Sequence, residues 1–233
     1  MKLKLLLLSC LIYSSLFASV KLDSVIVINS GIAGNTTKNL LLRLHKDCLA
    51  YKPDLTILMI GTNDMVKGKS LTLEQYKKNL TALVDTIQQA GSKVLLMTIL
   101  PFYEPYLLSR HSSESFQPEG PKGKRIEINK IIEQIAHDKN TYLLDVGNVF
   151  ENIGQVGEDA NSLIRNQQNS GHTDGVHPTA TGYRFLALAV SMFVIDHNLS
   201  AHTIVCFGDS ITKGDGSVDK VSYPAYLKTL LNN

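Results

Sequence analysis

Short apolar runs rich in β-branched residues recur along the chain, and each stops at a polar, glycine or proline turn. This pattern is typical of strands buried inside a sheet. The predicted strands are Val25–Asn29, Leu55–Ile60, Val94–Leu100, Tyr142–Val146 and Thr203–Phe207. We expect the first of them to be buried on both faces.

Amphipathic stretches separate these strands and predict helices. One begins at a capping box formed by Thr72 and Gln75 and ends before Gly91. The predicted helices cover 38–51, 72–89, 126–137, 179–197 and 223–230. Because strands alternate with helices, we predict an α/β fold with three layers, in which a parallel sheet is covered on both faces.

Two stretches do not fit this alternation. The segment from Phe102 to Arg125 is rich in proline, serine, glycine and charge, and it is too long for a simple connector. Such segments are usually lids, binding walls or disordered insertions, and the sequence leaves all three open. The polar stretch from Val146 to Thr173 is assigned no element.

The first residues are typical of a secretory leader. Lys2 and Lys4 precede an apolar run from Leu5 to Phe17, and small residues follow at Ala18 and Ser19. We therefore predict a signal peptide at residues 1–18, export to the periplasm or medium, and a single domain at 19–233. The run is short for a stable membrane span. A lipoprotein anchored at Cys10 is the minor alternative.

Composition indicates which classes of binding partner to expect. The 233 residues are 44% hydrophobic, 19% charged and 7% aromatic, with a net charge of +2. These values predict no basic stripe interleaved with stacking aromatics, so nucleic acid is not expected as a partner. A small or neutral substrate fits better. Cys48 and Cys206 lie in apolar stretches without metal-ligand spacing and are expected to be packed free thiols.

Three polar residues suggest nucleophilic catalysis. Gly208-Asp209-Ser210 follows a strand, at the edge where open α/β sheets place ligands. Asp174 and His177 lie three positions apart, so the carboxylate can orient the imidazole. A serine hydroxyl needs such a base to attack a carbonyl. A metal site made of His172, Asp174 and His177 is the alternative.

Two further turns supply candidates for stabilising an oxyanion, which requires preorganised N–H donors. Gly31 and Gly34 lie in the turn after the first strand, and either backbone amide is a candidate donor. Asn63 ends the second strand and offers a side-chain amide. Each of these residues alone is more often an ordinary turn residue.

Together, four segments resemble the SGNH hydrolases, also called the GDSL esterase/lipase family. They are Gly208-Asp-Ser210, Asn29-Ser-Gly-Ile-Ala-Gly34-Asn-Thr, Gly61-Thr-Asn63-Asp64 and Asp174-Gly-Val-His177-Pro. The resemblance implies that Ser210 is the nucleophile, His177 the base and Asp174 its orienter. It also implies an oxyanion hole made of the Ser210 amide, the Gly34 amide and the Asn63 side chain, with Gly31 in reserve, and no cofactor.

The order of the blocks departs from the family, in which the serine block comes first. Here it comes last, so the chain is similar to a circular permutant of a flavodoxin-like five-stranded fold. The linker from Asp196 to His202 then joins the old ends. It can extend roughly 23 Å across a gap of roughly 14 Å, three strand spacings. A chain cut from a tandem array is the alternative.

The resemblance implies an exported serine esterase that works through an acyl-enzyme. We expect its substrates to be short-chain acyl esters, mainly acetyl esters, of carbohydrates or small molecules, and no stable membrane insertion. A lysophospholipase or thioesterase of the same family is one alternative. A non-catalytic glycan-binding or cell-surface protein on this fold is another. Oligomeric state is not assigned.

Overall fold

The computed structural model describes residues 24–66, 71–199, 201–214 and 221–233. Its centre is a parallel sheet of five strands in the order β1-β5-β2-β3-β4. The strands are β1 (Ile26–Gly31), β2 (Leu55–Met59), β3 (Lys93–Met97), β4 (Tyr142–Leu144) and β5 (Thr203–Gly208). If β5 is counted first, this order becomes 2-1-3-4-5, the flavodoxin-like arrangement that was expected.

The last strand of the chain lies inside the sheet. β5 pairs with β1 on one side, where Gly31 is opposite Gly208, and with β2 on the other, where Met59 is opposite Gly208. The carboxyl ends of all three strands therefore meet at one edge. β1 itself is an edge strand with partly exposed residues, so the expectation that it is buried on both faces was wrong. Its isolated sequence does not reveal that only one neighbour pairs with it.

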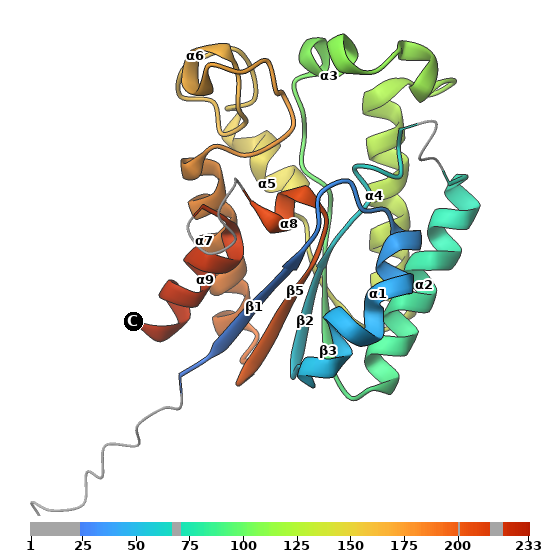
Figure 1. The fold of residues 1–233 in the computed structure, drawn as a ribbon, viewed down its shortest axis with the longest axis vertical. Helices are drawn as coiled ribbons and strands as arrows, with labels where there is room; N and C mark the ends of the chain where they lie inside the picture. Colours follow the sequence, from blue (N-terminus) through green and yellow to red (C-terminus); the bar gives the residue numbers. More distant parts are fainter. Residues whose placement is uncertain (1–23, 67–70, 200, 215–220) are drawn as a thin grey trace, which may run out of the picture.

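Helices cover both faces of the sheet (Figure 1). One layer contains α1 (Thr37–Asp47), α2 (Leu73–Gln89) and α4 (Gly120–Asp138), and the other contains α5 (Val146–Ile153), α7 (Ala180–Asp196) and α9 (Tyr223–Asn232). The shorter elements are α3 (Glu104–Arg110), α6 (Gln167–Ser170), α8 (Ser210–Lys213) and the 3-10 turns η1 (Leu49–Tyr51) and η2 (Ser113–Phe116).

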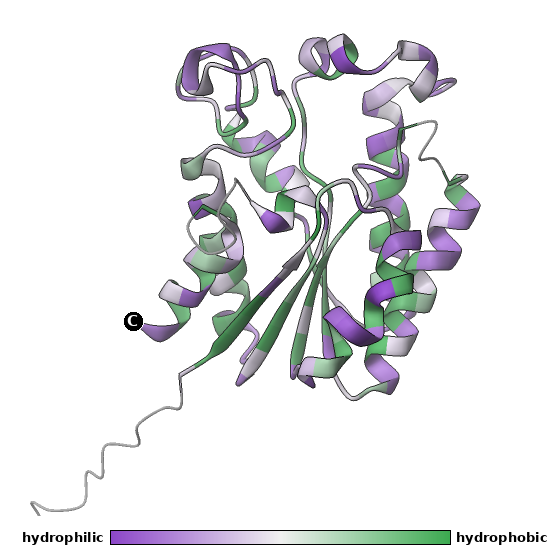
Figure 2. Ribbon diagram, in the orientation of Figure 1, coloured by the Kyte–Doolittle hydropathy of each residue, from purple (hydrophilic) through white to green (hydrophobic). Residues whose placement is uncertain are grey.

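Alternation along the strands divides the core into two apolar layers. Val205 and Phe207 pack toward α1, α2 and α4, whereas Ile204 and Cys206 pack toward α7 and α9. Figure 2 shows the strands as mostly hydrophobic and the helices as mixed. Cys48 and Cys206 are buried and free, as expected. Burial raises the pKa of their thiols to about 11 and about 12 respectively.

The two stretches that broke the sequence pattern contain helices. α3, η2 and the first turns of α4 lie within 102–125, so this segment is an ordered wall. α4 begins at Gly120, six residues before the predicted start, because Pro121 is tolerated in a first turn although it disfavours a helix elsewhere. α5 was not predicted. It is capped by Asp145, whose side chain accepts a hydrogen bond from the Asn148 amide.

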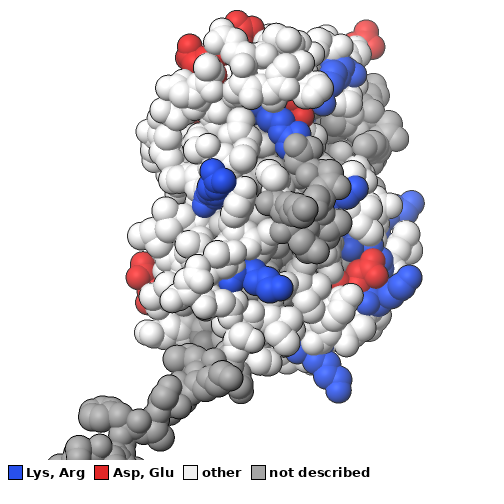
Figure 3. All heavy atoms as spheres, turned by 60° about the vertical axis from the view of Figure 1, so that its left-hand side comes forward, with Lys and Arg blue, Asp and Glu red and all other residues white. Residues whose placement is uncertain are grey.

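The surface carries no dense cationic patch on the face drawn in Figure 3. The Lys and Arg side chains of the described residues lie there mostly singly. Within the described residues, no helix is long and apolar enough to cross a membrane. The predicted leader, residues 1–18, lies outside the described residues.

Gly31 lets the end of β1 touch the backbone of α8. A Cβ atom built on Gly31 would lie 2.1 Å from the Lys213 amide nitrogen and 2.6 Å from the Thr212 carbonyl carbon. Both neighbours are backbone atoms, so they cannot move without shifting α8. The close approach places the turn after β1 directly beside the helix that begins with Ser210.

We expect Gly31→Ala to lower the free energy of unfolding by about 1–3 kcal/mol, the range typical of overpacking. Urea denaturation monitored by circular dichroism measures this loss. Gly157→Ala is the matched control, because a Cβ atom there meets nothing within 4 Å. Equal stability of the two variants would show that α8 accommodates the added methyl group.

Candidate active site

Ser210 lies where the interior strand β5 ends and a short helix begins. β5 stops at Gly208, Asp209 caps α8, and Ser210 is the first residue of α8. The Asp209 side chain accepts a hydrogen bond of 2.9 Å from the Ile211 amide. Gly208 is required here because an added Cβ would lie 2.4 Å from the Met59 carbonyl oxygen. The hydroxyl is therefore held at the carboxyl edge of the sheet.

The structure brings Ser210, His177 and Asp174 together. Ser210 Oγ lies 2.9 Å from His177 Nε2, and His177 Nδ1 lies 3.0 and 2.9 Å from the two Asp174 carboxylate oxygens. Since a carboxylate only accepts hydrogen bonds, Nδ1 carries the proton. Nε2 of the neutral ring is then the acceptor for the serine hydroxyl, as nucleophile activation requires.

The Asp174 carboxylate is also held by its own loop. Its Oδ1 accepts hydrogen bonds of 3.0 Å from the backbone amides of Val176 and His177. Burial alone raises the pKa of this carboxyl, but the hydrogen bonds and charge of His177 outweigh burial and hold the pKa below its ordinary value. Asp174 is therefore ionised at neutral pH and can stabilise a protonated imidazole.

α3 packs on the loop that carries Asp174 and His177. The Tyr103 amide donates to the Gly175 carbonyl oxygen at 2.8 Å, and Arg110 Nη2 donates to the Asp174 carbonyl oxygen at 2.6 Å. Gly175 has φ +71°, and a Cβ there would lie 2.7 Å from Tyr106 Cβ. Arg110 Nη2 also lies 3.8 Å from Asp174 Oδ1. Sequence reasoning missed Arg110, because the approach of α3 to this loop leaves no signal in the sequence.

The candidate oxyanion donors surround one cavity. This cavity, of about 280 Å³, is lined by Ser210 and His177 together with Ala33, Gly34, Thr62, Asn63, Val66, Leu107, Arg110, His111 and Val176. Gly34 has φ +77°, which favours glycine. Gly31 does not line the cavity, and its amide donates to Asn29 Oδ1 at 3.0 Å. Geometry thus favours Gly34 over Gly31.

Asn63 is fixed between the other two turns. Its side-chain nitrogen donates to the Asn35 carbonyl oxygen at 3.1 Å and to Asp209 Oδ2 at 3.3 Å. Its neighbour Asp64 is buried and accepts hydrogen bonds from the amide and hydroxyl of Thr37 at 3.0 and 2.7 Å. Burial raises the pKa of Asp64, and the bonds from Thr37 oppose that rise. The Asn63 turn is therefore anchored to the start of α1.

A single arginine connects the segments that carry the donors. From α1, the Arg43 guanidinium donates to the carbonyl oxygens of Ser30 at 3.0 Å and Gly208 at 2.9 Å, and to Asn35 Oδ1 at 2.7 Å. It also lies over the Phe207 ring, 4.4 Å from the centroid. Sequence reasoning missed Arg43 because an arginine on an amphipathic helix predicts a solvent-exposed face.

The alternative metal site has no support in the geometry. Throughout the described ranges, no group of three or more His, Cys, Asp or Glu side chains is arranged to hold a metal ion. His172, Asp174 and His177 therefore do not form a metal cluster. His177 instead uses its two ring nitrogens for Asp174 and Ser210.

Comparison with protein families identifies the class. The model of the GDSL-like lipase/acylhydrolase family matches residues 13–185, well over half of the chain. The chain belongs to this family. Three relatives of the chain are named as esterases, and together with the family they show that the chain is a carboxylic ester hydrolase.

Relatives of this GDSL-family chain include proteins named as esterases. It is 28% identical over 171 residues to an acetylxylan esterase from Geobacillus stearothermophilus, covering 70% of this chain and 69% of the relative. An uncharacterized lipoprotein from Bacillus subtilis is 32% identical over 130 residues, with 51% and 54% covered. An arylesterase from Vibrio mimicus is 36% identical over 80 residues, with 33% and 38% covered.

Solved structures share the GDSL-family fold. A lipase/acylhydrolase from Enterococcus faecalis has a TM-score of 0.56 at 21% identity, covering 70% of this chain and 72% of that one. A catalytic mutant of an acetylxylan esterase from Geobacillus stearothermophilus has a TM-score of 0.53 at 27% identity, with 71% and 69% covered.

Arg43→Lys should lower kcat about tenfold to a hundredfold while KM changes little. Lysine keeps the charge but cannot donate in the fork that joins Ser30, Asn35 and Gly208, and loss of an oxyanion donor typically costs more. Steady-state hydrolysis of 4-nitrophenyl acetate measures the change. Asp47→Asn is the control, because it weakens only the 3.4 Å contact with Arg43. A kcat equal to wild type would contradict a positioning role.

The Asp209 carboxyl should make stability fall as pH rises. Burial raises its pKa from 3.8 to about 6, against the opposing Ile211 amide. The folded form binds the proton more tightly, so its contribution is complete below pH 4 and is lost through pH 6. The loss is on the order of 3 kcal/mol. Urea unfolding between pH 4 and 7 should show a smaller decline in Asp209→Asn. Parallel pH dependences would refute this assignment.

Proposed function

We propose that the chain hydrolyses short-chain acyl esters of carbohydrates, with Ser210 as the nucleophile. The observation that carries the proposal is the chain of contacts from Ser210 Oγ through His177 to Asp174, at 2.9 and 2.9 Å. Ser210 attacks the ester carbonyl while His177 Nε2 takes its proton. The alcohol leaves with that proton, and water activated by His177 then releases the acid from the acyl-enzyme.

The negative charge formed during attack needs donors at one point. We assign this role to the amides of Ser210 and Gly34 and to the side chain of Asn63, which line the same cavity. The Asn63 nitrogen donates to Asp209 Oδ2 at the long distance of 3.3 Å. In our proposal the substrate oxygen shares or replaces this weak bond.

The cavity favours a small acyl group. Its volume of about 280 Å³ lies below the range of roughly 300–1,000 Å³ that is common for ligand pockets. Val66, Leu107 and Val176 provide apolar walls close to Ser210. The acetylxylan esterase relative is named for removing acetyl groups from a carbohydrate. These observations support acetyl esters over the long chains of a lysophospholipase.

We also infer that the chain is a circular permutant of the family. The family model ends at residue 185, before the Ser210 block, and β5 occupies the position counted first in the flavodoxin-like order. α7 ends at Asp196 and β5 begins at Thr203, so a short linker suffices to join them.

We also infer that the chain is exported, from the predicted leader at residues 1–18 and from the relative named as a lipoprotein. Residues 19–233 then form one domain.

The purified chain should hydrolyse 4-nitrophenyl acetate at least tenfold faster, in kcat/KM, than 4-nitrophenyl palmitate. Ser210→Ala should lose activity by about 10⁴-fold or more, because the nucleophile is absent. A fluorophosphonate probe should label Ser210 in the wild type, which peptide mapping detects.

The same assays distinguish the proposed esterase from the alternative functions. Activity should be proportional to protein concentration, whereas a steeper dependence indicates that partner chains complete the site, as in a tandem array. Preference for palmitate would favour a lysophospholipase or thioesterase. A wild type no faster than Ser210→Ala, and unlabelled by the probe, would favour a non-catalytic glycan-binding protein and refute the proposal.

A further inference from the structure

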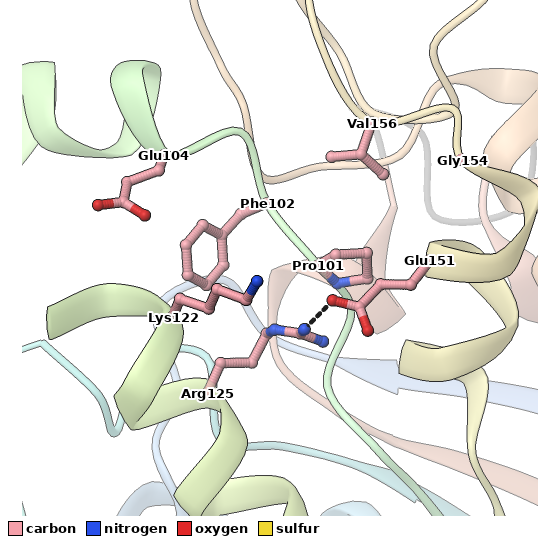
Figure 4. A pocket seen from close by; sticks show the side chains of 8 residues that line it. All are labelled: Pro101, Phe102, Glu104, Lys122, Arg125, Glu151, Gly154 and Val156. Atoms are coloured by element: carbon pink, nitrogen blue, oxygen red, sulfur yellow. Dashed lines mark hydrogen bonds and ion pairs between the residues drawn. The ribbon is translucent and has the colours of Figure 1, made fainter. Parts of the chain in front are cut away.

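A second cavity opens beside α3, separate from the Ser210 cavity. It measures about 260 Å³ and is lined mainly by the loop after β3, the first turns of α4, and α5 with the residues after it (Figure 4). We call it the Arg125 cavity. Its main side chains are Phe102, Lys122, Arg125 and Glu151. None of the residues assigned to ester hydrolysis lines it.

The Arg125 side chain is buried but has unused donors. Only 5% of the residue is exposed, and its guanidinium donates to Glu151. No second protein acceptor for it lies among the described residues. A guanidinium has five N–H groups, so several remain available toward the cavity. These donors are not among the buried unpartnered side-chain atoms of the described residues, so they are open to water or to a ligand in the cavity.

Two cations and two carboxylates line the cavity. Lys122 lies one helical turn before Arg125, so the two side chains share a face of α4. Figure 4 shows the Lys122 amino group between the Phe102 ring and the ion pair, while the Glu104 carboxylate turns away. Of the two carboxylates in the lining, only that of Glu151 contacts Arg125. The remaining guanidinium donors suit a planar carboxylate.

The position of the cavity connects it with the ester site. Glu104, at the start of α3, lines the Arg125 cavity, whereas Leu107 and Arg110, further along the same helix, line the Ser210 cavity. α3 has seven residues and is therefore roughly 10 Å long. An oligosaccharide can span such a distance. The Phe102 ring offers an apolar surface against which a sugar ring packs.

We propose that the Arg125 cavity binds a carboxylate-bearing sugar unit in the alcohol portion of the substrate. Arg125 and Lys122 contact the carboxylate, and Phe102 packs against the ring, while the acyl group of a linked unit lies at Ser210. The preferred substrates are then acylated acidic oligosaccharides. This inference rests on the proposed function, because the second unit must be the one that carries the ester.

The test compares two matched substrates. One is an acetylated trigalacturonate, and the other is the same trisaccharide after its carboxyl groups are reduced to primary alcohols. Wild type should show a kcat/KM about tenfold higher for the acidic form, the worth of one charge-assisted hydrogen bond. Lys122→Met should raise KM for the acidic form about fivefold to tenfold and leave kcat unchanged. Phe102→Leu, which removes the ring, should raise KM for both forms.

Two controls isolate the cavity. Lys124→Met removes a charge from the same helix outside the cavity lining and should leave both kcat/KM values unchanged. Hydrolysis of 4-nitrophenyl acetate should be equal in all variants, which shows that they fold. Equal kcat/KM for the two trisaccharides, or equal losses in Lys122→Met and Lys124→Met, would overturn the proposal.

A failed ester assay does not leave the cavity untested. If neither trisaccharide nor 4-nitrophenyl acetate is hydrolysed, the proposed function fails, and calorimetric binding of unacetylated trigalacturonate decides about the cavity. Binding that Lys122→Met weakens and Lys124→Met does not would support a carboxylate site. Absence of binding to the wild type at millimolar concentration would refute it.

Discussion

The parallel pairing of β5 with both β1 and β2 is the constraint on which the site depends. It places the carboxyl ends of three strands at one edge, although the residues involved lie at opposite ends of the chain. The turn after each strand then supplies one part of the site. Gly34 follows β1, Asn63 follows β2, and Ser210 follows β5. Without this pairing, Ser210 would not lie beside the turns that carry Gly34 and Asn63.

Several side-chain contacts fix the positions of the turns that follow these strands. Arg43 ties the ends of β1 and β5 to the Asn35 turn, and Asp64 ties the β2 turn to the start of α1. Both side chains are largely buried, and their hydrogen bonds go mainly to backbone groups or to short polar side chains. Buried polar groups that are fully bonded in this way strongly restrict alternative arrangements. The same network holds the segments of the oxyanion donors and anchors the adjacent turns.

The sequence predicted the strands, most helices and the three side chains that the structure brings together, Ser210, His177 and Asp174. These features leave strong local signals, such as the apolar run of β5 or the three-residue spacing of Asp174 and His177. It did not predict α5, the early start of α4, or the edge position of β1. It also missed Arg43 and Arg110, whose partners are mainly carbonyl oxygens. Such contacts depend on which backbone groups the fold brings near, and a residue's own neighbours in the sequence carry no record of them.

α3 both lines the Ser210 cavity and packs against the loop that carries His177. Its Leu107 and Arg110 line the Ser210 cavity, and the same helix, with Tyr103 before it, contacts the loop that carries His177. A substitution that reshapes this wall for a different substrate therefore also disturbs the support of the proton acceptor. Changes of specificity in this chain are expected to require compensating changes on both sides of α3, which links substrate choice to turnover.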